Sequence, residues 1–198
     1  MKITLIFVLL LGFIVRLNAE PLEEMEYILR FGFIKGGKAT LIAENEKINK
    51  KQAIHYRMRG RTTGIVDKIY EVNDVYESWV DPETYLPVKS IRNVKEQKYR
   101  FYDEVTYDHI NDSLFSLKSG RKKVPGKIND LVSVFFYIRQ NQYFEDLLAG
   151  KKVQIPVYHG DDLFMMELEY IGVEFIDTKI GRKECYVVSP KVPKGKLL

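Results

Sequence analysis

Side chains that carry acid–base or metal chemistry are few in this sequence and lie far apart. The three histidines, His55, His109 and His159, lack the His-Glu-x-x-His spacing that places two metal ligands on one helix face. His159 precedes Gly160-Asp161-Asp162, whose oxygens suit a cation, but a hairpin turn explains the same residues equally well. His55 is expected on the outward face of a strand. No metal site is therefore predicted.

Nucleophilic and carboxylate catalysis are weakly indicated as well. The sequence has no Gly-x-Ser-x-Gly turn, and Ser133 lies inside a predicted helix, where its hydroxyl can bond back to a helix carbonyl. Carboxylates are plentiful, but the sequence alone pairs none of them with a second catalytic group. We therefore predict that the protein is not an enzyme and has no cofactor. A hydrolase with a site of dispersed carboxylates and a histidine is kept as an alternative.

Aromatic residues give the stronger signal. The chain has thirteen Tyr, eleven Phe and one Trp, enough to fill the inner face of a sheet or to line an apolar cavity. Both options stay open at this level. Arg139 is expected to pair with a carboxylate of the sheet. The candidate ligand-binding residues are Phe135, Tyr137 and Arg139 on a helix and Trp79, Tyr99 and Phe101 on strands.

A helix from Asp130 to Phe144 is expected to position the first three of these residues. The β-branched and aromatic residues of this segment also allow a strand, but its apolar run is too continuous for strand alternation. A side-chain oxygen of Asn129 or Asp130 can cap its first turn. The apolar surface wraps most of the way round such a helix, so the helix must be enclosed by other elements. Its apolar residues form two neighbouring stripes, which are Leu131, Val134, Phe135 and Ile138, and Val132 and Phe136.

Period-two alternation predicts strands through most of the remaining chain. Gly36-Gly37 is expected to turn the first hairpin, and residues 64–72 are expected to form a short helix or a turn. Cys185 is expected to be a buried thiol. We predict a mainly β fold in which a strongly curved antiparallel sheet, a half-barrel or open barrel, wraps around one buried α-helix. The predicted strands are 26–35, 38–44, 53–62, 75–80, 88–94, 98–107, 114–117, 153–158, 164–175 and 184–189.

The N-terminus has the layout of a secretory signal peptide over residues 1–19, with a basic start, an apolar core and Ala19 before the cut. Residues 20–198 then form a single domain. The net charge of +4 would fall to +2 with the loss of Lys2 and Arg16. The sequence has no stripe of basic residues, so nucleic acid is not predicted as a partner. The single cysteine rules out an intramolecular disulfide and favours the periplasm. Membrane association is expected to be peripheral at most.

Several segments carry a resemblance to a known family. They are residues 26–39, Tyr76-Glu-Ser-Trp-Val-Asp with Leu86-Pro87, residues 130–139, residues 150–156 and Cys185-Tyr-Val-Val-Ser-Pro. In this order they resemble the domain of unknown function 3108 (DUF3108). The resemblance implies export into the envelope of a Gram-negative cell, and it brings no catalytic or binding residues with it. It also implies further strands beyond Pro190, so we expect a domain that lacks its usual C-terminal strands.

These observations favour a non-enzymatic envelope protein that binds or carries an apolar or amphiphilic ligand such as a lipid. The aromatic strands and the enclosed helix motivate this hypothesis. The alternative is a structural or assembly partner that pairs with another envelope protein through an exposed sheet edge.

Overall fold

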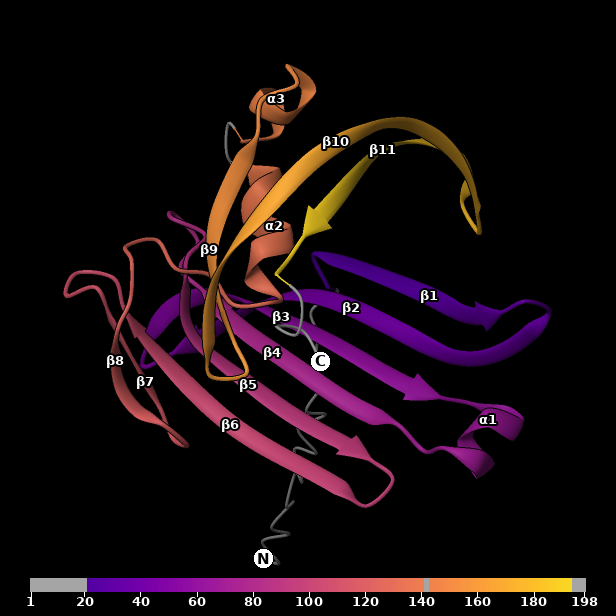
Figure 1. Ribbon diagram of the computed structural model, residues 1–198, viewed down its shortest axis with the longest axis horizontal. Helices are drawn as coiled ribbons and strands as arrows, with labels where there is room; N and C mark the ends of the chain where they lie inside the picture. The colour runs from indigo at the N-terminus through magenta and orange to yellow at the C-terminus, as the bar shows by residue number, and fades with distance from the viewer. Residues whose placement is uncertain (1–20, 141–142, 194–198) are drawn as a thin grey trace, which may run out of the picture.

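The computed structural model describes residues 21–140 and 143–193, which form two antiparallel β-sheets and three short helices (Figure 1). The larger sheet is an eight-stranded meander in sequence order. The predicted signal peptide, residues 141–142 and residues 194–198 lie outside the described ranges. The strands are β1 Glu23–Phe31, β2 Ile34–Ile48, β3 Lys51–Thr62, β4 Asn73–Val80, β5 Pro87–Glu96, β6 Tyr99–Asp108, β7 Ser113–Ser116 and β8 Gly120–Lys123, with α1 Gly64–Ile69 between β3 and β4.

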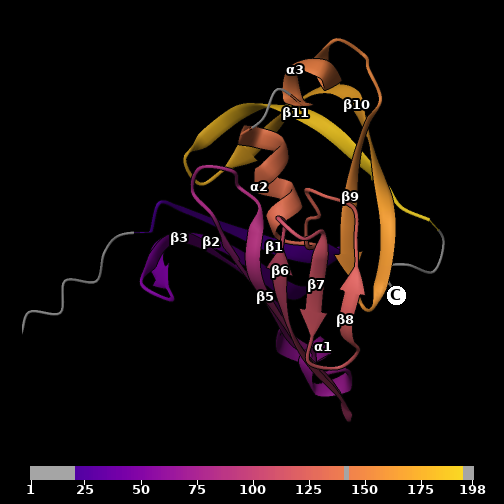
Figure 2. The same cartoon turned by 90° about the vertical axis from the view of Figure 1, so that its left-hand side faces the viewer.

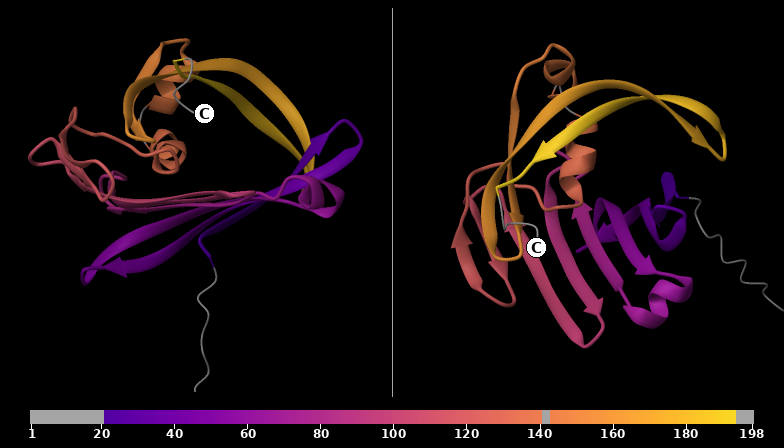
Figure 3. Two further views of the ribbon diagram at one scale, coloured as in Figure 1. Left: turned by 60° about the horizontal axis from the view of Figure 1, so that its bottom comes forward. Right: turned by 45° about the vertical axis from the view of Figure 1, so that its right-hand side comes forward.

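A smaller sheet arches over one side of the larger one (Figure 3). It contains β9 Val153–His159, β10 Asp162–Thr178 and β11 Gly181–Lys191, in the order β11-β10-β9. At one end, β9 is tied by a parallel bridge between Val157 and Asn129. At the other end, the tip of the β10–β11 hairpin reaches the edge strand β1, where Lys179 Nζ lies 3.1 Å from Glu26 Oε1.

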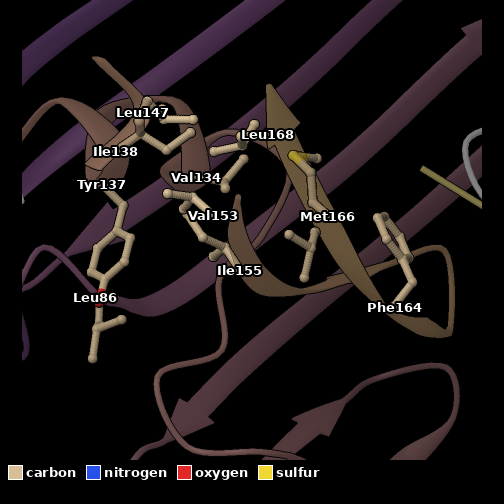
Figure 4. Close-up of a cluster of buried hydrophobic side chains, with 11 residues drawn as sticks. Leu86, Val134, Tyr137, Ile138, Leu147, Val153, Ile155, Phe164, Met166 and Leu168 are labelled. Atoms are coloured by element: carbon tan, nitrogen blue, oxygen red, sulfur yellow. The ribbon is translucent and has the colours of Figure 1, made fainter. Parts of the chain in front are cut away.

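Helix α2 (Ser133–Gln140) lies between the two sheets, and α3 (Tyr143–Leu148) follows it (Figure 2). Val134, Tyr137 and Ile138 pack with α3, β9 and β10 in one apolar cluster (Figure 4). Val132 and Phe136 lie on the opposite side of the helix and pack against β2, β3 and β4. The helix therefore joins two apolar cores, one in each sheet.

The prediction of a mainly β fold with antiparallel strands is confirmed, but the structure does not show the predicted single curved sheet wrapped around the helix. The chain leaves the larger sheet after β8, and the edge of β9 pairs with Asn129 instead of with β8. Two sheets result. Because Phe135 and Arg139 on α2 stay exposed, the helix is covered on two sides and is not wrapped completely.

Local boundaries differ from the predictions in several places. The first hairpin turns at Gly32, which has a φ of 60°, and Gly36-Gly37 lies inside β2. A Cβ on Gly37 would lie 2.8 Å from the carbonyl oxygen of Arg61, so this glycine serves the close approach of β2 and β3. Residues 120–123, where no strand was predicted, form β8, and the helix predicted over 130–144 is divided between α2 and α3. Cys185 is partly exposed, not buried.

Candidate functional site

Helix α2 rests on one row of directly opposed residues on the inner face of the larger sheet. We call this row the helix row; its members are Glu23, Ala43, Tyr56, Ser78 and Ser90, one from each of β1 to β5. Phe136 stacks on Tyr56 with 3.6 Å between ring centroids. Ser78 Oγ donates to Asp130 Oδ2 at 2.6 Å, and Arg139 Nη1 lies 3.0 Å from Glu23 Oε2. Ala43, Ser78 and Ser90 are small, which lets the helix approach the sheet closely.

The start of α2 is fixed by three hydrogen bonds between Asp130 and the residues that follow it. Asp130 Oδ1 accepts from the backbone N–H groups of Val132 and Ser133, and Ser133 Oγ accepts from the backbone N–H of Asp130. The sequence-based prediction of a cap at this position is confirmed. Burial raises the pKa of Asp130, because the carboxylate has left water, while the hydrogen bond from Ser78 opposes the shift.

The next inner row along the same strands runs beside the helix and is only partly covered. We call it the open row; its members are Met25, Leu41, Met58, Tyr76 and Arg92, again one from each of β1 to β5. All five side chains are half-buried. The open row therefore consists of four apolar or aromatic side chains followed by the cation Arg92. Asp103 on β6 lies directly opposite Arg92 in the next strand.

The arch contributes a second apolar surface above this part of the sheet. Tyr170 and Val188 point into the core, and strand alternation and pairing place Val173, Phe175 and Tyr186 on the same inner face. These three side chains are 45%, 58% and 52% exposed. Figure 1 shows the β10–β11 hairpin arching on one side of α2, above the edge strand β1. We call these three residues the arch face.

Arg92 lies at the boundary between the open row and a small interior cavity. The cavity offers about 40 Å³ to the centres of water molecules and is lined by charged and polar side chains. Since each water needs about 10–15 Å³ measured in this way, it holds roughly three. Its polar lining residues include Ser90, Arg92, Asp103, Tyr107, Asp130, Tyr158 and His159.

The family model described as "Protein of unknown function (DUF3108)" matches residues 26–198, nearly the whole chain. The chain belongs to this family. No curated protein and no solved structure matches the chain. The family resemblance found in the sequence is thus confirmed, and the site of this DUF3108 protein has to be read from its own residues.

The six predicted ligand-binding residues of the DUF3108 protein do not form one site. Tyr137 is buried in the core with Leu86 and Val134. Phe135 is displaced by about 160° around the helix from Tyr137 and is 49% exposed. Arg139 pairs with Glu23, as predicted for a carboxylate of the sheet.

The three predicted strand residues are not brought together. Phe101 is on the inner face and packs beneath Arg92, with 4.7 Å between the ring centroid and the guanidinium carbon. Tyr99 is exposed near the end of β6. Trp79 lies on the outer face, where it stacks on His55 at 4.2 Å and donates to Glu46. Only Phe135, Arg139 and Phe101 therefore border the region beside α2.

The histidines have structural surroundings. On the outer face, His55 Nδ1 lies 2.9 Å from Glu46 and Nε2 lies 3.1 Å from Glu77. Burial lowers the pKa of His55, and the two carboxylates oppose that shift. His159 faces the interior cavity, whereas Asp161 turns to Lys122 and Tyr158. Within 21–140 and 143–193, no three His, Cys, Asp or Glu side chains are grouped to hold a metal ion.

The two rows and Arg92 were missed at the level of sequence. Met25, Leu41, Met58 and Tyr76 each occupy an inward position of an alternating strand, and this signal is visible. Their alignment in one row depends on the register of three strand pairs, which alternation does not supply. Over the described part of the chain, no helix is both long and apolar enough to cross a bilayer.

The neutral state of His159 should make stability depend on pH. Burial, followed by the charge of Arg92, lowers the pKa of His159 from 6.5 to about 4. The unfolded chain then binds more protons between these values, so stability is fully present above pH 6.5 and is lost as the pH falls towards 4. The loss is expected to reach about 3 kcal/mol.

Urea unfolding of the protein and of His159→Gln from pH 7 to pH 4 measures this contribution. The difference between the two unfolding free energies should shift by about 3 kcal/mol across the window, in favour of the variant at low pH. The opposite effect of Asp130, whose pKa is raised, is common to both proteins and cancels in the difference. A difference that stays constant with pH would contradict the expectation.

Proposed function

We propose that this DUF3108 protein is a non-enzymatic binding or carrier module for a long-chain amphiphile. The apolar tail would lie along the open row, between the helix and the arch face. The proposal rests on large apolar side chains of α2 and of the arch face that stay about half exposed. They include Phe135, Val173, Phe175 and Tyr186. Large exposed apolar patches mark binding surfaces, because leaving them in water is unfavourable.

The dimensions of the open row support this ligand class. From Met25 to Arg92 the row crosses four interstrand spacings of about 4.8 Å, which is about 19 Å. One leaflet of a bilayer core is about 15 Å thick, so the row matches the length of an extended acyl chain. Met25 and Met58 are unbranched and adaptable, as surfaces that accept flexible apolar chains often are.

The other concave regions fit an amphiphile less well. Ligand pockets usually enclose about 300–1,000 Å³, far more than the roughly 40 Å³ cavity between α2 and the sheet. An open pocket of about 520 Å³ lies by the β2–β3 turn, but most of the residues that line it carry polar or charged groups, including Asn49, Gln52 and Lys89. The space beneath α2 is therefore filled by side chains, and the tail would bind beside the helix.

Two neighbouring residues of β2 provide a matched test. Leu41 belongs to the open row, whereas Ile42 points to the outer face, and both are half-buried. Leu41→Gln is expected to weaken the binding of laurate and of dodecyl maltoside about tenfold, because it places an amide in the path of the tail. Ile42→Gln should stay within about twofold of the unchanged protein.

Isothermal titration calorimetry below the micelle concentration measures both affinities, and native mass spectrometry of the protein purified from cells detects a retained amphiphile. The proposal fails if neither probe binds and no amphiphile is retained. It also fails if the two variants lose affinity equally. With residues 1–19 acting as a signal peptide, the protein would bind its ligand in the periplasm.

An assembly role through a sheet edge is the second candidate, and β11 is the observation that favours it. In the described part of the chain β11 pairs with β10 alone, which leaves unpaired N–H and C=O groups along eleven residues. Lys183, Pro190 and Lys191 on this strand are typical protections against edge pairing, which weakens the case. A stoichiometric protein partner that a competing strand peptide releases, without a bound amphiphile, would favour assembly.

A further inference from the structure

We propose that the amphiphile carries a single carboxylate headgroup, which Arg92 holds at the inner end of the open row with His159 beside it. This assignment rests on the proposed function, because it concerns the headgroup of the ligand whose tail would lie on the open row. It deepens that function from amphiphiles in general to fatty-acid-like ligands.

Arg92 is a cation without an acidic partner among the described residues. No carboxylate in those ranges lies within 4.0 Å of its guanidinium nitrogens, and its Nε is buried without a hydrogen-bond partner. The guanidinium carbon lies 4.7 Å from the ring centroid of Phe101 and 5.9 Å from that of Tyr76. A guanidinium held between two rings presents its N–H groups in a fixed fork, which matches the two oxygens of a carboxylate.

His159 adds a hydrogen-bond donor at the same place. It is 8% exposed, lines the same cavity, and has no hydrogen bond to any other described residue. Burial and the charge of Arg92 lower the pKa of His159, so its imidazole is neutral at pH 7. One nitrogen of the neutral ring carries a proton and can donate a hydrogen bond, and His159 adds no charge to the site. The neighbouring Gly160 allows this packing, since a Cβ there would lie 3.0 Å from Arg92 Nη1.

Two buried carboxyl groups decide between headgroups. Asp103 accepts from Ser116 Oγ and from the backbone N–H of Lys118, and Asp130 accepts from Ser78 and from the start of α2. Both line the cavity, so they repel an anion there and repel a doubly charged one twice as strongly. With room for roughly three waters, the cavity suits the two oxygens of a carboxylate better than a phosphate group.

Calorimetry with three probes of one chain length tests the assignment. Laurate carries the carboxylate, dodecyl phosphate carries a larger and more highly charged anion, and dodecyltrimethylammonium carries a cation. The unchanged protein is expected to bind laurate at least tenfold more tightly than either of the other two. Equal or tighter binding of dodecyl phosphate or of dodecyltrimethylammonium would overturn the carboxylate assignment.

Arg92→Gln is expected to weaken laurate binding about 10- to 100-fold, since it removes charge-assisted hydrogen bonds. Its affinity for dodecyl maltoside should stay within about twofold, which separates the headgroup from the tail. Arg92→Lys keeps the charge without the fork and should recover part of the loss. Arg57→Gln, on the outer face, is the control and should bind laurate as the unchanged protein does.

The outcomes distinguish the two proposals. If Arg92→Gln and Arg92→Lys bind laurate as tightly as the unchanged protein, while Leu41→Gln still weakens every dodecyl probe, the headgroup assignment is wrong and the tail site stands. If no dodecyl probe binds the unchanged protein, the amphiphile function itself is wrong. Circular dichroism and urea unfolding of each variant show that a lost affinity does not come from a lost fold.

Discussion

Replacing Phe136 with alanine is expected to lower the free energy of unfolding by about 3–5 kcal/mol, the range for removing a large buried aromatic side chain. Phe136 is 3% exposed, and its ring stacks on Tyr56, which is equally buried. Together with Val132, which directly precedes α2, it packs against β2, β3 and β4 of the larger sheet. Its removal opens a void that two rigid sheets close only partly. Urea unfolding followed by far-UV circular dichroism measures the loss.

The adjacent Phe135 provides the control for this experiment. The two residues have the same side chain and the same helix, but Phe135 is 49% exposed. Phe135→Ala should therefore change the free energy of unfolding by less than about 1 kcal/mol. If the two variants lose equal stability, α2 does not lie with Phe136 towards the sheet, and the positions of the helix row and the open row would both be wrong.

The apolar pattern of α2 explains how much of the fold the sequence predicts. Two stripes at helical spacing predicted a helix that needs covering on more than one side, and Val134 and Phe136 do pack into different cores. The cap at Asp130 and the pairing of Arg139 with a carboxylate followed from local chemistry as well. Such features depend on residues close in sequence or on one obvious charge, so alternation and spacing are enough to find them.

The division into two sheets depends on contacts that no local pattern encodes. The edge of β9 meets Asn129 through a bridge between residues 28 positions apart, and nothing in the alternation of either segment specifies that partner. Gly37 shows the same limit at smaller scale. A glycine pair between two predicted strands is typical of a hairpin turn. In the structure, Gly37 is required for another reason: a Cβ there would lie only 2.8 Å from the backbone of Arg61 on the neighbouring strand.

The candidate site shows where residue type alone misleads. Trp79 and Tyr137 were chosen as large amphipathic side chains, but Trp79 lies on the outer face and Tyr137 fills the core. The inward positions of Met58 and Tyr76 follow from alternation, and only the register of β3 with β4 makes them neighbours. A site that consists of one residue from each of five strands becomes visible when the pairing is known, because each residue is ordinary by itself.

Asp130→Ala is expected to destabilise the protein by about 3 kcal/mol. The substitution removes a helix cap, which typically contributes about 0.5–2 kcal/mol. It also leaves the Ser78 hydroxyl and the backbone N–H groups of Val132 and Ser133 buried without an acceptor, and each unsatisfied group costs about 1–3 kcal/mol unless water reaches it. Thermal or urea unfolding at pH 7 measures the change.

Asp130→Asn separates the hydrogen bonds from the charge. The amide oxygen can still accept from the start of α2, and the amide N–H₂ can donate to Ser78 Oγ, so the expected loss is below about 1 kcal/mol. Because burial raises the pKa of Asp130, the carboxylate costs stability as the pH rises above about 4, and the asparagine variant avoids this cost. Equal losses in the alanine and asparagine variants would mean that the charge of Asp130, and not its hydrogen bonding, holds α2 on the helix row.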